Sequence, residues 1–381
     1  MKADPRRLLR HVEALSCPRP TGSPAEAGAA RYAREALARW GIESWEETFT
    51  AVADMNWFPI SAAAFALLAI PTYFALPWLG AAISAMAPYL LWYALTRADS
   101  PLRFLLPRVR SGNVVARVPP RGDVRRRAVV LAHLDTNRCR LAWEAKSVST
   151  IVIGTTVTLA AYLLEVGVLF IGALSGTRVF GYAALPLGLY AAAVVGFLLW
   201  ELRMPFSPGA NDNASAVAVA LELVAGLVRE PLDHTEVWVC FTGAEEVDHR
   251  GAKELLRRHP ELRDAYFLVL EGVGAGKLTI VKSEGILFRY RPDPELFSLA
   301  METAGAHPEW GVTSAPMTIV CETQALRRRG CRALTLAGRD PATGTLPRWH
   351  APDDLPEHIS TDALGGAWAF LGALLSTLDG L

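Results

Sequence analysis

Five short segments of the chain, taken in order, carry side chains that can bind metal ions or move protons. They contain two imidazoles and five carboxylates, which are His133, Asp135, Asp212, Glu245, Glu246, Glu271 and His350. Neutral imidazole and carboxylate are common zinc ligands, and a catalytic zinc keeps one position for water. A carboxylate that binds no metal can take up and return a proton. Together, these residue types are sufficient for metal-assisted hydrolysis.

The sequence around each residue indicates how it is positioned. His133 and Asp135 stand two residues apart where an apolar strand ends, so their side chains point the same way. Asp212 lies in a loop rich in glycine and asparagine before a helix, and Glu245 and Glu246 follow a strand and a tight turn. Taken singly, each of these segments also fits an ordinary strand end, helix cap or solvated helix face.

Glu271 and His350 complete the set. Glu271 follows the apolar residues 267–270, where a lone charge is explained better by a cation partner than by packing. His350 lies in a loop flanked by prolines, and Asp353 and Asp354 follow it closely. An exposed histidine is the ordinary explanation of such a loop.

In this order, the segments resemble those of the co-catalytic di-zinc exopeptidases, a family that includes bacterial leucyl aminopeptidases, glutamate carboxypeptidases and the related glutaminyl cyclases. The resemblance includes residues 19–23 and Thr335-Leu336, and it covers about residues 10–56, 98–140 and 205–380. Two positions depart from the family pattern. Glu271 stands where many members carry aspartate, and Ala216 replaces a common glycine.

The resemblance implies the zinc-exopeptidase fold, an α/β domain with a mixed, mostly parallel sheet and helices on both faces. It also implies two Zn²⁺ per chain as cofactors. His133 and Glu271 would bind one ion, Glu246 and His350 would bind the other, and Asp212 would bridge them.

The same resemblance makes Glu245 the general base, which takes a proton from a water that bridges the metals. Asp135 would accept the proton of the second ring nitrogen of His133, or otherwise brace that ring. The implied activity is that of an exopeptidase, in the first place an aminopeptidase, with a peptide as its substrate.

Apolar runs that alternate with helical periodicity independently predict an α/β sheet covered on both faces. The expected strands are residues 42–52, 111–118, 128–132, 236–241 and 266–270. The expected helices are residues 24–40, opened by a Ser-Pro-Ala-Glu capping box, 213–229, 251–258 and the apolar stretch 363–378, which is expected to be a core helix.

Two long apolar blocks interrupt the hydrolase-like sequence. Residues 57–96 contain no charged side chain, and residues 147–200 contain only Glu165 and Arg178. Because about 20 apolar residues of helix cross a bilayer, each block suits two crossings. The alternative is that the blocks are buried helices of a large soluble domain. Inside lipid, Glu165 is expected to lie towards the far interface or to pair with Arg178.

The predicted domains are therefore a discontinuous zinc hydrolase domain at residues 1–56, 98–146 and 201–381, and transmembrane hairpins at 57–97 and 147–200. Four spans place both termini on one side. Eight basic residues near the spans lie on that side, against Arg178 on the other; they are Arg97, Arg103, Arg108, Arg110, Arg138, Arg140, Lys146 and Arg203. This bias predicts a multi-pass membrane protein with a cytoplasmic catalytic domain. The charged N-terminus and five scattered cysteines agree with that orientation.

Composition and completeness of the site separate the competing functions. Lysine plus arginine equals aspartate plus glutamate at 38 each, so no nucleic-acid partner is expected, whereas a lipid bilayer is. The enzyme alternatives are an N-acyl amino acid amidohydrolase and a glutaminyl cyclase-like enzyme, although cyclases use one zinc. A non-catalytic membrane receptor or scaffold usually loses a ligand or the base, and a transporter would depend on Glu165 alone.

Overall fold

The computed structural model describes residues 4–96, 98–141 and 148–381, and the chain divides into two compact units. The first unit comprises Met1–Ala51, Val109–Lys146 and Pro205–Leu381, and the second comprises Val52–Arg108 and Ser147–Met204. Each unit is therefore discontinuous in sequence. Arg97, Lys146 and Ser147, which enter the predicted boundaries or the charge count, lie outside the described residues.

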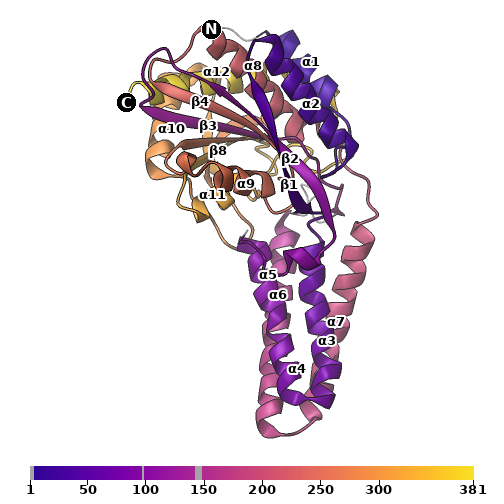
Figure 1. The fold of residues 1–381 in the computed structure, drawn as a ribbon. Helices are drawn as coiled ribbons and strands as arrows, with labels where there is room; N and C mark the ends of the chain where they lie inside the picture. The colour runs from indigo at the N-terminus through magenta and orange to yellow at the C-terminus, as the bar shows by residue number, and fades with distance from the viewer. Residues whose placement is uncertain (1–3, 97, 142–147) are drawn as a thin grey trace. The chain divides into compact units, whose positions relative to one another are not determined.

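An eight-stranded sheet forms the centre of the first unit, in the order β1-β2-β4-β3-β5-β8-β6-β7 (Figure 1). The strands are β1 (Ser44–Val52), β2 (Arg108–Val118), β3 (Arg126–His133), β4 (Thr235–Thr242), β5 (Tyr266–Glu271), β6 (Lys277–Ser283), β7 (Thr313–Pro316) and β8 (Arg332–Arg339). Strands β4, β3, β5 and β8 are parallel, β2 and β6 pair antiparallel with β4 and β8, and β7 is parallel to β6. The predicted mixed, mostly parallel sheet is confirmed.

Helices pack on the sheet of this unit. One large core joins the sheet to α1 (Pro5–Leu15), α2 (Pro24–Arg39), α8 (Ala216–Arg229), α10 (Pro294–Ala306) and α12 (Thr361–Asp379). Helix α11 (Glu322–Arg328) instead packs on β5 and β8 and contacts α9 (Arg250–Arg258). Helix α12 buries Leu364, Phe370 and Leu374, so the apolar stretch at 363–378 is a core helix, as predicted.

The strand register brings the ends of three parallel strands to one edge of the sheet. His133, the last residue of β3, lies opposite Thr242, the last residue of β4. On the other side of β3, Leu131 lies opposite Val269, two residues before Glu271 at the end of β5. Side chains that follow these strands therefore meet at the same edge, where parallel α/β sheets commonly bind ligands.

The second unit contains five α-helices within its described residues: α3 (Trp57–Ala75), α4 (Pro77–Ser84), α5 (Met86–Thr96), α6 (Val148–Ser175) and α7 (Val179–Glu201). Helix α3 packs against α4, α5 and α7, and α6 packs against α4 and α7 (Figure 1). The chain turns at Leu76, before Pro77, and again at residues 176–178. Proline disfavours helix at the preceding residue, which explains the first turn.

Among the described residues, five helical stretches are long and apolar enough to cross a membrane, and four of them lie in the second unit. They are Trp57–Ala75, Pro77–Thr96, Ser149–Ser175 and Val179–Glu201, of which only 17 to 44% is buried. The fifth, Ala210–Arg229, is 94% buried and contains the core helix α8. In the second unit, large apolar side chains such as Trp78, Phe170 and Leu189 are exposed.

Glu165 was expected to lie towards the far interface or to pair with Arg178. Its carboxylate is buried, lies inside α6 rather than at the end of the helix, and accepts no hydrogen bond from a described residue. The alternative of a pairing with Arg178 is therefore wrong, and the position towards the far interface stays a prediction. Tyr162, one helical turn earlier on α6, is buried as well.

Candidate metal centre

Asp212 lies between the imidazoles of His133 and His350. Its Oδ1 is 3.1 Å from His133 Nε2, and its Oδ2 is 3.3 Å from His350 Nε2. Glu271 Oε1 lies 3.4 Å from the same nitrogen of His133, and Glu246 Oε1 lies 3.3 Å from that of His350. The five residues thus form two groups, each with one imidazole and one glutamate, and Asp212 belongs to both.

These spacings fit metal coordination. Ligands about 2.0–2.2 Å from a tetrahedral zinc lie roughly 3.3 Å from one another, which is the separation seen within each group. One ligand atom each from His133, Asp212 and Glu246 also lie within 4.8 Å of one another. The distances between these ligand atoms are therefore compatible with two ions that share Asp212 as a ligand.

The electrostatics of the centre also fit cations. Burial raises the pKa of Glu245 well above its usual range and raises that of Glu271 to about 7. Burial alone would lower the pKa of His133, but the carboxylates of Glu271 and Glu245 outweigh it and raise that pKa well above 6.5. Buried Glu246 Oε1 and Glu271 Oε2 accept no hydrogen bond from the described residues. The carboxylates thus exceed the positive charge around them, and divalent cations would balance this excess.

Asp135 braces His133, as predicted, but does so through its main chain and not through its carboxylate. The Nδ1 atom of His133 lies 3.0 Å from the backbone oxygen of Asp135 and 3.8 Å from its carboxylate. That carboxylate instead accepts hydrogen bonds from the backbone N–H groups of Glu245 (3.0 Å) and Glu246 (3.3 Å) and from Thr21 Oγ1 (2.7 Å). Asp135 therefore fixes the turn that presents both glutamates, while its main chain orients His133.

Hydrogen bonds to two later segments of the chain hold the loop that carries Asp212. Asp354 accepts hydrogen bonds from the backbone N–H groups of Asn211 (2.8 Å) and Asp212 (3.0 Å). Asn213 Nδ2 donates to the backbone oxygen of Leu270 at the end of β5, and Asn213 Oδ1 accepts from Gly272 N–H. The Asp212–Asn213 peptide bond is cis. The hydrogen bonds of Asn213 fasten the loop that carries Asp212 to the strand that carries Glu271.

Two residues near the N-terminus join this framework. The buried guanidinium of Arg19 donates to the backbone oxygens of Leu134 (2.6 Å), Pro208 (3.1 Å) and Gly209 (3.2 Å). Glu26 is part of the predicted capping box, in which Ser23 Oγ accepts from Glu26 N–H. Its carboxylate also accepts from Ala244 N–H, at 3.1 Å, directly before Glu245.

Sequence reasoning missed several of these contacts. It noted Asp354 only as following His350, and it gave no role to Asn137, whose amide donates to Glu246 Oε2 at 2.8 Å. It also missed His249, whose Nε2 lies 3.4 Å from Glu245 Oε1. The aspartate after His350 and the asparagines beside Asp212 were visible signals. The roles of Asn137 and His249 depend on contacts that appear only in the folded chain.

We expect Asp354→Ala to destabilise the Asp212 loop. Removing the carboxylate leaves two buried N–H groups without their acceptor, at about 1–3 kcal/mol each, and outer-shell losses typically weaken metal affinity about 10–100-fold. Urea unfolding and zinc titration would measure both effects. Asp353→Ala is the matched control, because the Asp353 side chain is 59% exposed and pairs with Arg348 at the surface. Equal stability and zinc affinity in the two variants would contradict the role of Asp354.

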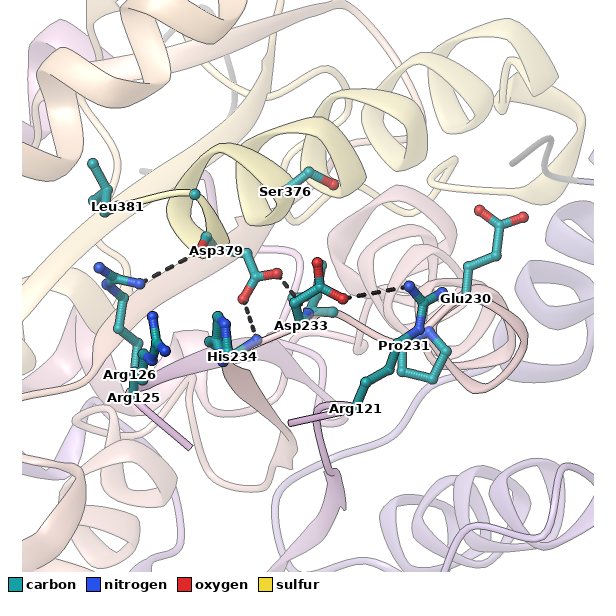
Figure 2. Close-up of a pocket in the computed structure, with 12 residues that line it drawn as sticks. Arg121, Arg125, Arg126, Glu230, Pro231, Asp233, His234, Ser376, Asp379 and Leu381 are labelled. Atoms are coloured by element: carbon teal, nitrogen blue, oxygen red, sulfur yellow. Dashed lines mark hydrogen bonds and ion pairs between the residues drawn. The ribbon is translucent and has the colours of Figure 1, made fainter. Parts of the chain in front are cut away.

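A separate hollow of about 540 Å³ lies near the start of β3, at the end of that strand opposite His133 (Figure 2). The Asp379 carboxylate accepts from the backbone N–H groups of Asp233 (2.6 Å) and His234 (2.8 Å), and Arg121 pairs with Asp233 at 3.4 Å. These charges fasten the end of α12 to the loop before β4. None of the predicted site residues lines this hollow.

Part of the sequence is similar to known peptidases. Residues 202–373 match Peptidase family M28, and this range contains Asp212, Glu245, Glu246, Glu271 and His350. The chain is 30% identical over 173 residues to aminopeptidase YwaD of Bacillus subtilis (strain 168), a match that covers 42% of this chain. It spans 36% of the length of that relative.

Solved structures share the fold at low sequence identity. A glutaminyl cyclase of Bacteroides thetaiotaomicron, solved with N-acetylhistamine, superposes with a TM-score of 0.61 at 14% identity, covering 99% of this chain and 98% of that one. A zinc-dependent exopeptidase of Parabacteroides distasonis gives 0.58 at 12% identity, covering 100% and 98%. The chain is therefore similar to Peptidase family M28 over residues 202–373, and its fold is one that zinc-dependent exopeptidases share with glutaminyl cyclases.

Proposed function

We propose that the first unit is a two-zinc exopeptidase. Among exopeptidases, an aminopeptidase is the leading candidate. The observation that carries this proposal is the position of Asp212, which presents one oxygen to His133 and the other to His350. His133 and Glu271 would hold one ion, Glu246 and His350 the other, and Asp212 both. When bound, the ions supply Lewis acidity, which acidifies water and stabilises negative charge on the substrate carbonyl oxygen.

In this proposal, Glu245 moves the proton. Water attacks the carbonyl carbon of the peptide bond, Glu245 accepts the proton that the water loses, and the same carboxyl donates it to the leaving nitrogen as the C–N bond breaks. Burial raises the pKa of Glu245, which favours a carboxyl that both accepts and donates a proton. Asp135 supports the reaction by holding the Glu245–Glu246 backbone.

The test compares substrates on protein purified in detergent. An aminopeptidase hydrolyses peptides and aminoacyl anilides with a free N-terminus and is inactive on their N-acetylated forms. Elemental analysis should find two zinc ions per chain, removed together with activity by a chelator and restored by zinc. Activity on N-acetylated amino acids alone would indicate an amidohydrolase, and no turnover by zinc-loaded protein would indicate a receptor or scaffold.

Glutaminyl cyclisation is the second candidate, because glutaminyl cyclases of known structure share this fold. A cyclase would release ammonia from a peptide that begins with glutamine and would leave every peptide bond intact. The presence of both imidazoles and all three ligand carboxylates around Asp212 supports hydrolysis instead. Mass spectrometry of one glutamine-initiated peptide after incubation distinguishes the two products.

We also propose that the second unit forms two transmembrane hairpins, which makes this an integral membrane peptidase. Helices this long, with so little of their surface buried and with Trp78, Phe170 and Leu189 exposed, would carry an apolar surface far larger than a water-soluble monomer usually shows. Charge bias around the spans supports a cytoplasmic catalytic domain. Arg203 and Arg108 lie on the proposed cytoplasmic side, and Arg178 lies in the opposite turn.

Thiol labelling tests this orientation. Cys17 is exposed in the first unit, whereas the other four cysteines are buried. We expect a membrane-impermeant maleimide to label a cysteine-free variant carrying Ser175→Cys on intact cells. A variant that retains only Cys17 should react only after permeabilisation. Labelling of Cys17 but not of the turn cysteine on intact cells would reverse the orientation.

A further inference from the structure

The chain bends back on itself just after the two glutamates. Asp248 has φ 69° and His249 has φ 50°, so two consecutive residues that are not glycine adopt left-handed backbone. This conformation is uncommon for such residues and persists only where the surrounding structure enforces it. Two hydrogen bonds close the bend, from His249 N–H to Glu245 O and from Arg250 N–H to Ala244 O, each 2.9 Å long.

The bend directs an imidazole at the proposed base. The side chain of His249 is 2% exposed, and its Nε2 lies 3.4 Å from Oε1 of Glu245, whose side chain is 4% exposed. This distance is longer than that of an ideal hydrogen bond. Hydrogen bonds of catalytic groups are often long before substrate binds and shorten in the complex.

A buried ion pair maintains the bend. Lys253 Nζ lies 2.6 Å from Asp248 Oδ2, and the Lys253 side chain is 2% exposed. Burying two charges is costly unless they are paired, so this contact restrains the residue next to His249. Lys253 N–H also donates to His249 O as α9 begins. The imidazole is thus fixed from the helix that follows it.

We propose that His249 is a positioning residue for Glu245. Its Nε2–H donates to Oε1 of the carboxylate, which restricts rotation of the side chain and leaves Oε2 for the water and the leaving nitrogen. This inference rests on the proposed function, because it takes Glu245 as the base. It adds a residue outside the set of metal ligands, one that acts on proton transfer without binding metal.

Two substitutions at position 249 test the donor. His249→Leu fills similar volume without a donor, and His249→Gln keeps an amide N–H near the position of Nε2. We expect His249→Leu to lower kcat about 10–100-fold, the usual effect of losing an outer-shell partner, with KM and zinc content unchanged. His249→Gln should restore kcat to within a few-fold of wild type. Wild-type kcat in His249→Leu would overturn the proposal.

A double-mutant cycle with Glu245→Gln separates positioning from structure. If His249 acts through Glu245, adding His249→Leu to Glu245→Gln should change the residual rate little, because the two effects share one interaction. An undiminished effect in that background, or loss of zinc and thermal stability that His249→Gln does not restore, would overturn the proposal. Full activity of Glu245→Gln alone would instead refute the proposed base. The two failures are therefore distinguishable.

Discussion

Glu245→Gln is expected to lose nearly all turnover, by at least the roughly 100-fold typical of a missing general base. The amide has the size of the carboxylate but cannot accept a proton at neutral pH. The backbone of residue 245 is held by Asp135, through a hydrogen bond that the substitution leaves in place. We therefore expect unchanged zinc content, unchanged circular dichroism and nearly unchanged KM alongside the loss of kcat.

Glu222→Gln is the matched control for this change. Glu222 is as deeply buried as Glu245, but it lies on α8 and pairs with Arg7 at 2.7 Å. We expect this variant to retain kcat, with its effect confined to stability. Turnover within a few-fold of wild type in Glu245→Gln would show that another group moves the proton.

Asp212→Ala is expected to remove both metal ions. The structure places one Asp212 oxygen against each imidazole, at 3.1 and 3.3 Å, so neither half of the centre is complete without this residue. Substitution by alanine also leaves the carboxylates of Glu246 and Glu271, which repel each other electrostatically, without a shared ligand between the two ion positions. Activity should fall below detection, and added zinc should not restore it at concentrations that saturate the wild-type protein.

The single-imidazole variants provide the comparison. His133→Ala and His350→Ala each remove a ligand from one group only, so each should mainly weaken one of the two ions. Elemental analysis after dialysis should give about two ions for the wild type, fewer in each histidine variant and none in Asp212→Ala. The reason is that each ion needs its imidazole, its glutamate and Asp212 for tight binding. Two retained ions in Asp212→Ala would mean that the bridge lies elsewhere.

Local sequence was sufficient for the elements that bear the site. Strands β3, β4 and β5 are short apolar runs, and their ends mark the positions of His133, Glu245 and Glu271. Strands β6 and β7 were not predicted, because β6 contains two lysines, Lys277 and Lys282, and β7 has only four residues. Helix α8 begins at Ala216, later than predicted, because the loop around Asp212 is bonded to Asp354.

Contacts between distant segments were beyond local reasoning. Glu26 is recognisable as a capping residue, but its bond to Ala244 joins positions 218 apart in sequence. Asp135 was expected to hold its neighbour His133, whereas its carboxylate bonds the backbone 110 residues away at Glu245. Such bonds depend on which strands become neighbours, and strand order is set by the packing of the whole sheet.

The interleaving of the two units has a consequence for biosynthesis. His133 and Asp135 precede α6 and α7 in the chain, whereas Asp212 and the remaining ligands follow them. A ribosome therefore completes all four apolar stretches before it makes the first residue able to join both halves of the centre. Strand β3 must wait for β4 and β5, its neighbours on either side, to emerge later. Domains generally fold as units during synthesis, so the nascent chain carries an incomplete centre until His350, the last of the proposed ligands, has been made. The order of the segments thus delays assembly of the proposed metal centre.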